Sequence, residues 1–167
     1  MIQVAQDPRY FTYLSDAPAR PTVVLGDGRF SLRQVPNATF DMLVLDAFSS
    51  DAIPTHLLTL EALTDVRRVV RPGGTIVIHV SNRYYDLAPA IGAAGGRLGM
   101  TVLQRRYAPT DAEALAGASP SAWVVMTIDP ATVAALRARG WEDVDATGVE
   151  PVTDDHPDVL RFLHIGS

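Results

Sequence analysis

Aspartates stand at the ends of two apolar segments of the sequence. Asp27 comes directly after residues 22–26, and Asp46 is the last residue of segment 40–46. A second carboxylate, Asp51, follows Asp46 after four intervening residues. A single aspartate after a strand commonly caps a helix or turns the chain. Two such positions, one with another carboxylate close by, favour a functional site at this edge of the predicted sheet.

Five short apolar segments are predicted to be strands, and helical segments alternate with them. The strands comprise residues 22–26, 40–46, 75–81, 101–104 and 123–128. Continuous runs rich in β-branched residues are typical of strands covered on both faces of a parallel sheet. Helices are predicted over residues 59–70, after Asp86, and after Asp129, which precedes a proline. The alternation predicts one α/β domain over residues 1–167, with a right-handed crossover between the second and third strands.

In an open α/β sheet, ligands bind beyond the carboxyl ends of the strands. Residues 81–85 follow the third strand and include Tyr84, which could stack on a ligand or simply pack. His79 lies inside that strand and is predicted to be a packed core histidine. The chain has no cysteine, and no group of His, Asp and Glu has the spacing of metal ligands. We therefore expect no metal site.

The composition excludes several classes of protein. Hydrophobic residues make up 47% of the chain and charged residues 20%, which is typical of a globular domain. The net charge of −5 and the scattered arginines argue against nucleic-acid binding. No apolar run is long enough to span a membrane, and the first residues resemble neither a signal peptide nor a transit peptide. A cytoplasmic location is expected.

Five segments of the chain resemble the spermidine synthase (polyamine aminopropyltransferase) family, and the resemblance covers essentially all 167 residues. The most specific is similar to the active-site segment of that family, in the bacterial branch often fused to membrane domains. The segments, in order, are residues 26–28, 45–63, 71–74, 79–84 and 152–161. The resemblance implies a Rossmann-like, class I methyltransferase-type three-layer sandwich with a mostly parallel sheet.

The family moves an aminopropyl group from decarboxylated S-adenosylmethionine, a co-substrate rather than a tightly bound cofactor, to a polyamine. By resemblance, Asp46 is the base, and Asp51 is its catalytic and substrate-binding partner. The four residues between these aspartates depart from the family pattern, which has two. The resemblance also implies two binding groups: Asp27, Gly28, Asp46 and Ala47 for the nucleoside, and Asp51, Asp154, Asp155 and Tyr84 for the polyamine. The residues alone leave other roles open, a strand-to-helix turn for Gly28 and a solvated tail turn for Asp154 and Asp155.

The resemblance also implies that the first two strands and the glycine-rich nucleoside loop of the family lie outside this chain. In the family strand order 3-2-1-4-5-7-6, the absent strands lie between segments 22–26 and 40–46. Without them, two strand edges expose unpaired backbone groups. The chain could be a fragment of a longer protein, could pair the two segments directly, or could cover its edges in a homo-oligomer. We favour the fragment and expect this chain alone to be inactive.

Two other functions remain open at this point. An S-adenosylmethionine-dependent methyltransferase on the same fold would use Asp46 to position its acceptor. A non-catalytic remnant would instead act as an oligomeric assembly module through its exposed strand edges.

Overall fold

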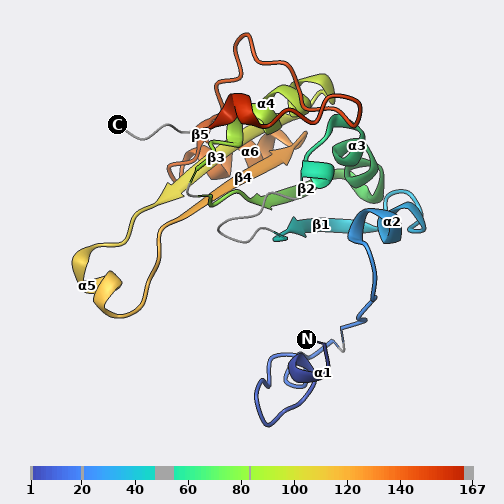
Figure 1. The fold of residues 1–167 in the computed structure, drawn as a ribbon, viewed down its shortest axis with the longest axis vertical. Helices are drawn as coiled ribbons and strands as arrows, with labels where there is room; N and C mark the ends of the chain where they lie inside the picture. The colour runs from blue at the N-terminus through green and yellow to red at the C-terminus, as the bar shows by residue number, and fades with distance from the viewer. Residues whose placement is uncertain (1, 20, 48–54, 83, 164–167) are drawn as a thin grey trace.

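The computed structural model describes residues 2–19, 21–47, 55–82 and 84–163, and its centre is a five-stranded sheet (Figure 1). The strand order is β1-β2-β4-β3-β5. The strands are β1 (Phe40–Leu45), β2 (Val70–His79), β3 (Thr101–Tyr107), β4 (Ser121–Thr127) and β5 (Glu142–Asp143). The helices are α1 (Ile2–Ala5), α2 (Gly28–Arg33), α3 (Leu60–Val69), α4 (Ala88–Arg97), α5 (Asp111–Leu115) and α6 (Pro130–Arg137), with 3-10 turns η1 (Thr55–Leu57) and η2 (Leu160–Phe162).

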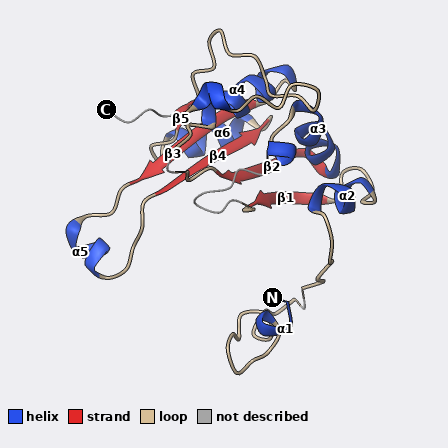
Figure 2. Cartoon of the chain, viewed as in Figure 1, coloured by secondary structure: helices blue, strands red, loops and turns tan. Residues whose placement is uncertain are grey.

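The sheet confirms the α/β, Rossmann-like class and refines its strand directions (Figure 2). β1 pairs with β2 in parallel, whereas β4 runs antiparallel to both β2 and β3. Because β4 lies between them, β2 and β3 point the same way without touching. Three strands therefore share one direction, although the only parallel pair among the described residues is β1–β2. The order β1-β2-β4-β3 corresponds to the 4-5-7-6 part of the expected family order.

Two helices begin where local sequence signals predicted. The Thr59 hydroxyl accepts a hydrogen bond from the Ala62 amide and caps α3, and the Asp129 carboxylate caps α6. Asp86, however, is not the N-cap of α4, because that position is held by Leu87. α3 buries one face against the sheet through Ala62, Leu63, Val66 and Val69.

Glycines in α4 let this helix lie close to the sheet. A methyl group on Gly95 would overlap the Val102 side chain of β3, and one on Gly92 would lie 2.7 Å from a methyl carbon of Val144. Gly96, in contrast, faces open space. The glycine-rich segment is therefore the middle of a packed helix, in which Gly92 and Gly95 permit close approach of neighbouring side chains.

The predicted first strand is wrong, since residues 21–25 form no regular secondary structure and Val24 and Leu25 are exposed. A strand is stabilised by a ladder of hydrogen bonds, and among the described residues no other strand pairs with residues 21–25 to supply one. The same lack of a neighbour leaves β1 at the sheet edge, so the prediction of strands covered on both faces is also wrong for β1. Direct pairing of segment 22–26 with β1 is not seen among the described residues.

Candidate functional site

Asp46 directly follows β1, at the carboxyl end of the parallel pair β1–β2. β2 ends beside it at His79, and the Asp46 Oδ1 atom lies 2.8 Å from the His79 Nδ1 atom. The Asp46 side chain is 58% exposed. Among the described residues, its Oδ2 atom makes no hydrogen bond. Within the part of the chain that the structure describes, Asp46 therefore has one carboxylate oxygen without a hydrogen bond, at the edge of the sheet where ligands bind in this fold class.

His79 connects Asp46 to the neighbouring strand β4. The His79 Nε2 atom lies 2.6 Å from the Ser81 hydroxyl oxygen, which also accepts a hydrogen bond of 2.8 Å from the Ala122 amide. The imidazole stacks on the Trp123 indole, with 4.5 Å between ring centroids and 28° between planes. The ring is thus packed, as predicted, but it also holds Asp46, which sequence reasoning missed. His79 and Ser81 both fall in the predicted strand 75–81, where a spacing of two residues places side chains on the same face, so their contact had an available signal.

The series of contacts from Asp46 through His79 to Ser81 has the residue types of a hydrolase triad. In such a triad the serine hydroxyl is the exposed nucleophile and the aspartate is buried. Here the exposed end is the carboxylate, while the Ser81 oxygen is tied to the backbone of β4. The arrangement therefore presents a carboxylate, not a hydroxyl, for chemistry.

A cavity of about 840 Å³ lies between β1 and the segment leading into α2. Gly28, Asp46 and Ala47 line it, so three of the residues expected to bind the nucleoside share one space with apolar side chains such as Phe30 and Leu45. Volumes of 300–1,000 Å³ are typical of pockets for small ligands. Asp27 is not among its lining residues, because its carboxylate caps α2 by accepting a hydrogen bond of 2.8 Å from the Phe30 amide.

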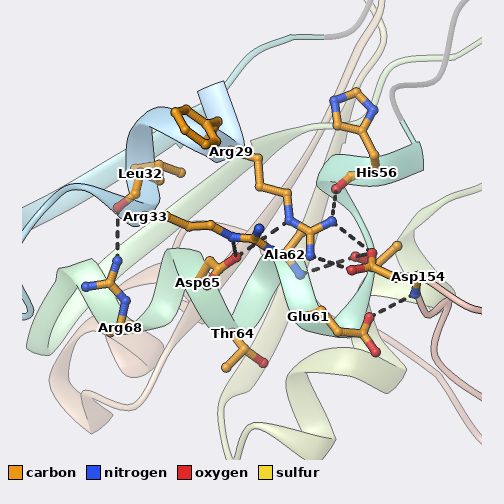
Figure 3. Close-up of polar contacts among 12 residues, drawn as sticks. Arg29, Leu32, Arg33, His56, Glu61, Ala62, Thr64, Asp65, Arg68 and Asp154 are labelled. Carbon is orange, nitrogen blue, oxygen red and sulfur yellow. Dashed lines mark hydrogen bonds and ion pairs between the residues drawn. The ribbon is translucent and has the colours of Figure 1, made fainter. Parts of the chain in front are cut away.

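Asp154 lies in an ionic cluster that joins the C-terminal segment to α2 and α3 (Figure 3). Its two carboxylate oxygens accept hydrogen bonds of 2.8 and 2.7 Å from the Arg29 guanidinium, and Oδ1 also accepts one of 2.7 Å from the Thr59 hydroxyl. These bonds to the charged form lower the pKa of Asp154 to about 2, with the Arg29 contact contributing most. Arg29, only 12% exposed, was not predicted, because its partner lies 125 residues away in the sequence.

Comparisons with known proteins agree with the resemblance, although no family model matches the chain. Over 88 residues, the chain is 30% identical to the polyamine aminopropyltransferase of Vibrio vulnificus (strain CMCP6), a match that covers 50% of this chain and 28% of that protein. The crystal structure of a probable spermidine synthase from Corynebacterium glutamicum ATCC 13032 superposes with a TM-score of 0.58 at 18% identity, covering 83% of this chain and 56% of that one. MNMC2 from Aquifex aeolicus aligns with a TM-score of 0.49 at 23% identity, covering 82% and 40%.

Half of this chain is thus similar in sequence to a polyamine aminopropyltransferase, and 83% of it shares the fold of a probable spermidine synthase. The relatives that it matches are longer, since the match covers 28% of the curated protein and 56% of the solved structure. In this chain, the crossover from β1 through α3 to β2 brings Asp46 and His79 to one edge of the sheet.

The remaining expected site residues lie at the surface of the chain or outside the described part. The Tyr84 side chain is exposed, and its amide donates to the Asn82 side chain. Asp155 is exposed beside Asp154. Asp51 lies outside the described residues. In the described ranges, no three His, Asp or Glu side chains are grouped to hold a metal ion, and no helix is long and apolar enough to cross a membrane.

Proposed function

We propose that this chain supplies the proton-accepting half of an aminopropyltransferase site. The enzyme moves an aminopropyl group from decarboxylated S-adenosylmethionine to a polyamine, and Asp46 is its base. One observation carries the proposal: the Asp46 carboxylate follows the parallel strand β1, lines the 840 Å³ cavity and keeps its Oδ2 atom free of hydrogen bonds among the described residues. The identity to the Vibrio vulnificus polyamine aminopropyltransferase supports the choice of reaction.

The reaction explains why a carboxylate is needed. An alkylamine with a pKa near 10.4 is almost wholly protonated at neutral pH, and freeing its lone pair costs about 4–5 kcal/mol. In the proposed step, the Oδ2 atom of Asp46 takes a proton from the amine nitrogen. The nitrogen lone pair then forms a bond to the aminopropyl carbon next to sulfur. The carbon–sulfur bond breaks, and its electron pair stays on sulfur, so the sulfonium leaves as neutral methylthioadenosine.

The other site residues divide between the two substrates. In this proposal, Asp27, Gly28 and Ala47 contact the nucleoside together with Asp46. Asp51, Asp154, Asp155 and Tyr84 face the cationic amine, whose remaining charge favours carboxylates nearby. Since the match covers 28% of the curated relative, the proposal concerns the protein of which this chain forms part, and we expect the chain alone to be inactive.

The test is Asp46→Asn in the full-length protein. Asparagine keeps the size of the side chain but cannot accept the amine proton, so kcat should fall about 100- to 10,000-fold. The affinity for methylthioadenosine, measured by calorimetry, should stay within about 3-fold of wild type, since the nucleoside contacts remain. Asp41→Asn is the matched control, because Asp41 also lies on β1 but pairs with Arg71 and does not line the cavity. Wild-type turnover by the Asp46 variant would remove Asp46 from the mechanism.

Nucleoside preference separates this proposal from the other two functions. Tighter binding of decarboxylated S-adenosylmethionine than of S-adenosylmethionine supports aminopropyl transfer, and the reverse preference supports a methyltransferase. The exposed edge of β1 is the observation that favours an assembly module. Absence of binding by either nucleoside, together with a stable dimer in sedimentation experiments, would establish that third function instead.

A further inference from the structure

His79 is the only described residue whose side chain forms a hydrogen bond with Asp46. We propose that His79 is a positioning residue for the proton transfer. Its Nδ1–H group holds Oδ1 of Asp46, so that Oδ2 is the oxygen turned to the substrate amine. This inference rests on the proposed function for its catalytic consequence, but the hydrogen bond itself can be tested without any turnover.

The directions of the two imidazole hydrogen bonds follow from the Asp46 carboxylate, which can only accept. The Ala122 backbone amide donates to the Ser81 oxygen, so the Ser81 hydroxyl hydrogen is free to point to the His79 Nε2 atom. In a neutral imidazole that accepts at Nε2, the proton resides on Nδ1. Nδ1–H then donates to the Asp46 carboxylate over 2.8 Å. The opposite tautomer would turn a nitrogen lone pair towards a carboxylate, which is repulsive.

The position of the imidazole is fixed from three sides. It stacks on Trp123, its cross-strand neighbour in β4. Its Nε2 atom forms a hydrogen bond with Ser81, and its Cβ atom is attached to the backbone of β2. Asp46, by contrast, is 58% exposed and follows the last residue of an edge strand. An exposed carboxylate samples several rotamers unless a partner restrains it. His79 is held by the paired strands β2 and β4, and it therefore restrains the orientation of the Asp46 carboxylate.

A catalytic carboxylate must be held closely, since a misplacement of about 1 Å can cost about 100-fold in rate. The Asp46–His79 contact restrains one oxygen and leaves the lone pairs of the other available. Ser81 and Trp123 would then act on the reaction only through His79.

The first experiment reads the tautomer directly, by nitrogen-15 NMR of the His79 ring in the purified chain. We expect a proton on Nδ1, either in the neutral Nδ1–H tautomer or in the doubly protonated ring. In Asp46→Ala, the Nδ1–H tautomer loses its acceptor, so the signal should shift towards the Nε2–H tautomer. A wild-type ring with its only proton on Nε2 would overturn the inference, whatever the activity of the protein.

The second experiment replaces His79 in the full-length enzyme by two amide side chains of different length. In His79→Asn the amide nitrogen can occupy the place of Nδ1 and still donate to Asp46. In His79→Gln it reaches the place of Nε2 and contacts Ser81 instead. We expect His79→Gln to lower kcat about 10- to 100-fold with little change in KM, and His79→Asn to stay within about 5-fold of wild type. Equal kcat values for the two variants would show that the Nδ1 donor has no role.

His79→Phe completes the set, since it keeps the stack on Trp123 but lacks both hydrogen bonds. It should match His79→Gln in kcat and wild type in nucleoside affinity. If it retains wild-type kcat, packing alone suffices and the inference fails. If the wild-type protein transfers no aminopropyl group, the proposed function fails, whereas the NMR experiment still decides whether His79 holds Asp46.

Discussion

β1 and β2 are neighbouring apolar strands of one sheet, yet their side chains differ sharply in burial. Ile76 and Ile78 of β2 are fully buried, whereas Met42 and Val44 of β1 are 59% and 52% exposed. The two strands pair in parallel register, with Val44 opposite Val77. β2 has a strand on each side and helix α3 packed against it, while β1 has β2 on one side only. An apolar strand sequence thus indicates that other segments must cover the strand. Of these two strands, the described part of the chain covers β2 and leaves β1 exposed.

The largest expected effect contrasts a core residue with an edge residue. Ile76→Ala should lower the free energy of unfolding by about 2–5 kcal/mol, because it removes buried methyl groups and leaves a cavity. Met42→Ala should change it by less than about 0.5 kcal/mol, since the side chain is already in water. Urea denaturation of the purified chain measures both. A cost above about 1 kcal/mol for Met42→Ala would contradict the exposed edge and indicate that another subunit covers it in solution.

A smaller effect compares two adjacent glycines on opposite sides of α4. Gly95→Ala should destabilise the protein by about 1–3 kcal/mol, because the added methyl group overlaps Val102 in the covered half of the sheet. Gly96→Ala, the matched control, adds the same methyl group in open space and should stabilise the helix by about 0.5–1 kcal/mol. Thermal unfolding should therefore shift in opposite directions for the two variants. A shift in the same direction would contradict the close packing of α4 on the sheet.

Sequence signals predicted those features whose interacting groups lie close together along the chain. The caps of α3 and α6 lie within three residues of the groups they bind, so Thr59 and Asp129 were recognisable from the sequence. The end of β1 was predicted to within one residue for the same reason, since the strand ends at Leu45 and the apolar run and Asp46 are adjacent. The predicted strand over residues 22–26 failed because a strand also needs a partner, and sequence alone does not say which partners are present.

The interactions around the site depend on residues that are distant in the sequence. Asp46 and His79 are 33 residues apart and meet only because β1 and β2 pair in parallel. The stack of His79 on Trp123 needs the antiparallel register of β4. His79 was therefore predicted as a packed residue, which it is, without the hydrogen bond that gives it a role. Arg29 and Asp154 were missed as a pair for the same physical reason.

The smallest expected effect concerns the ionic cluster beside the exposed side of the sheet. The pKa of Asp154 is lowered from its usual 3.8 to about 2 in the folded protein, chiefly by Arg29. A carboxyl group with a lowered folded-state pKa stabilises the fold above its unfolded pKa, and this stabilisation is lost as the pH falls towards the folded value. The window is therefore about pH 4 down to about pH 2. Because the Asp154 side chain is 40% exposed, solvent screening limits the contribution to about 1 kcal/mol.

Asp154→Asn should accordingly be less stable than wild type by about 1 kcal/mol near pH 7, and the difference should shrink below pH 4 as wild type loses its charge. Urea denaturation at a series of pH values measures the difference. Asp155→Asn is the control, because Asp155 is exposed and makes no ion pair among the described residues, so it should change stability by less than about 0.5 kcal/mol at neutral pH. A difference for Asp154→Asn that stays constant from pH 7 to pH 2.5 would show that its charge does not contribute. The cluster would then hold the C-terminal segment through hydrogen-bond geometry, which asparagine partly preserves, and Arg29 would be the better residue to substitute.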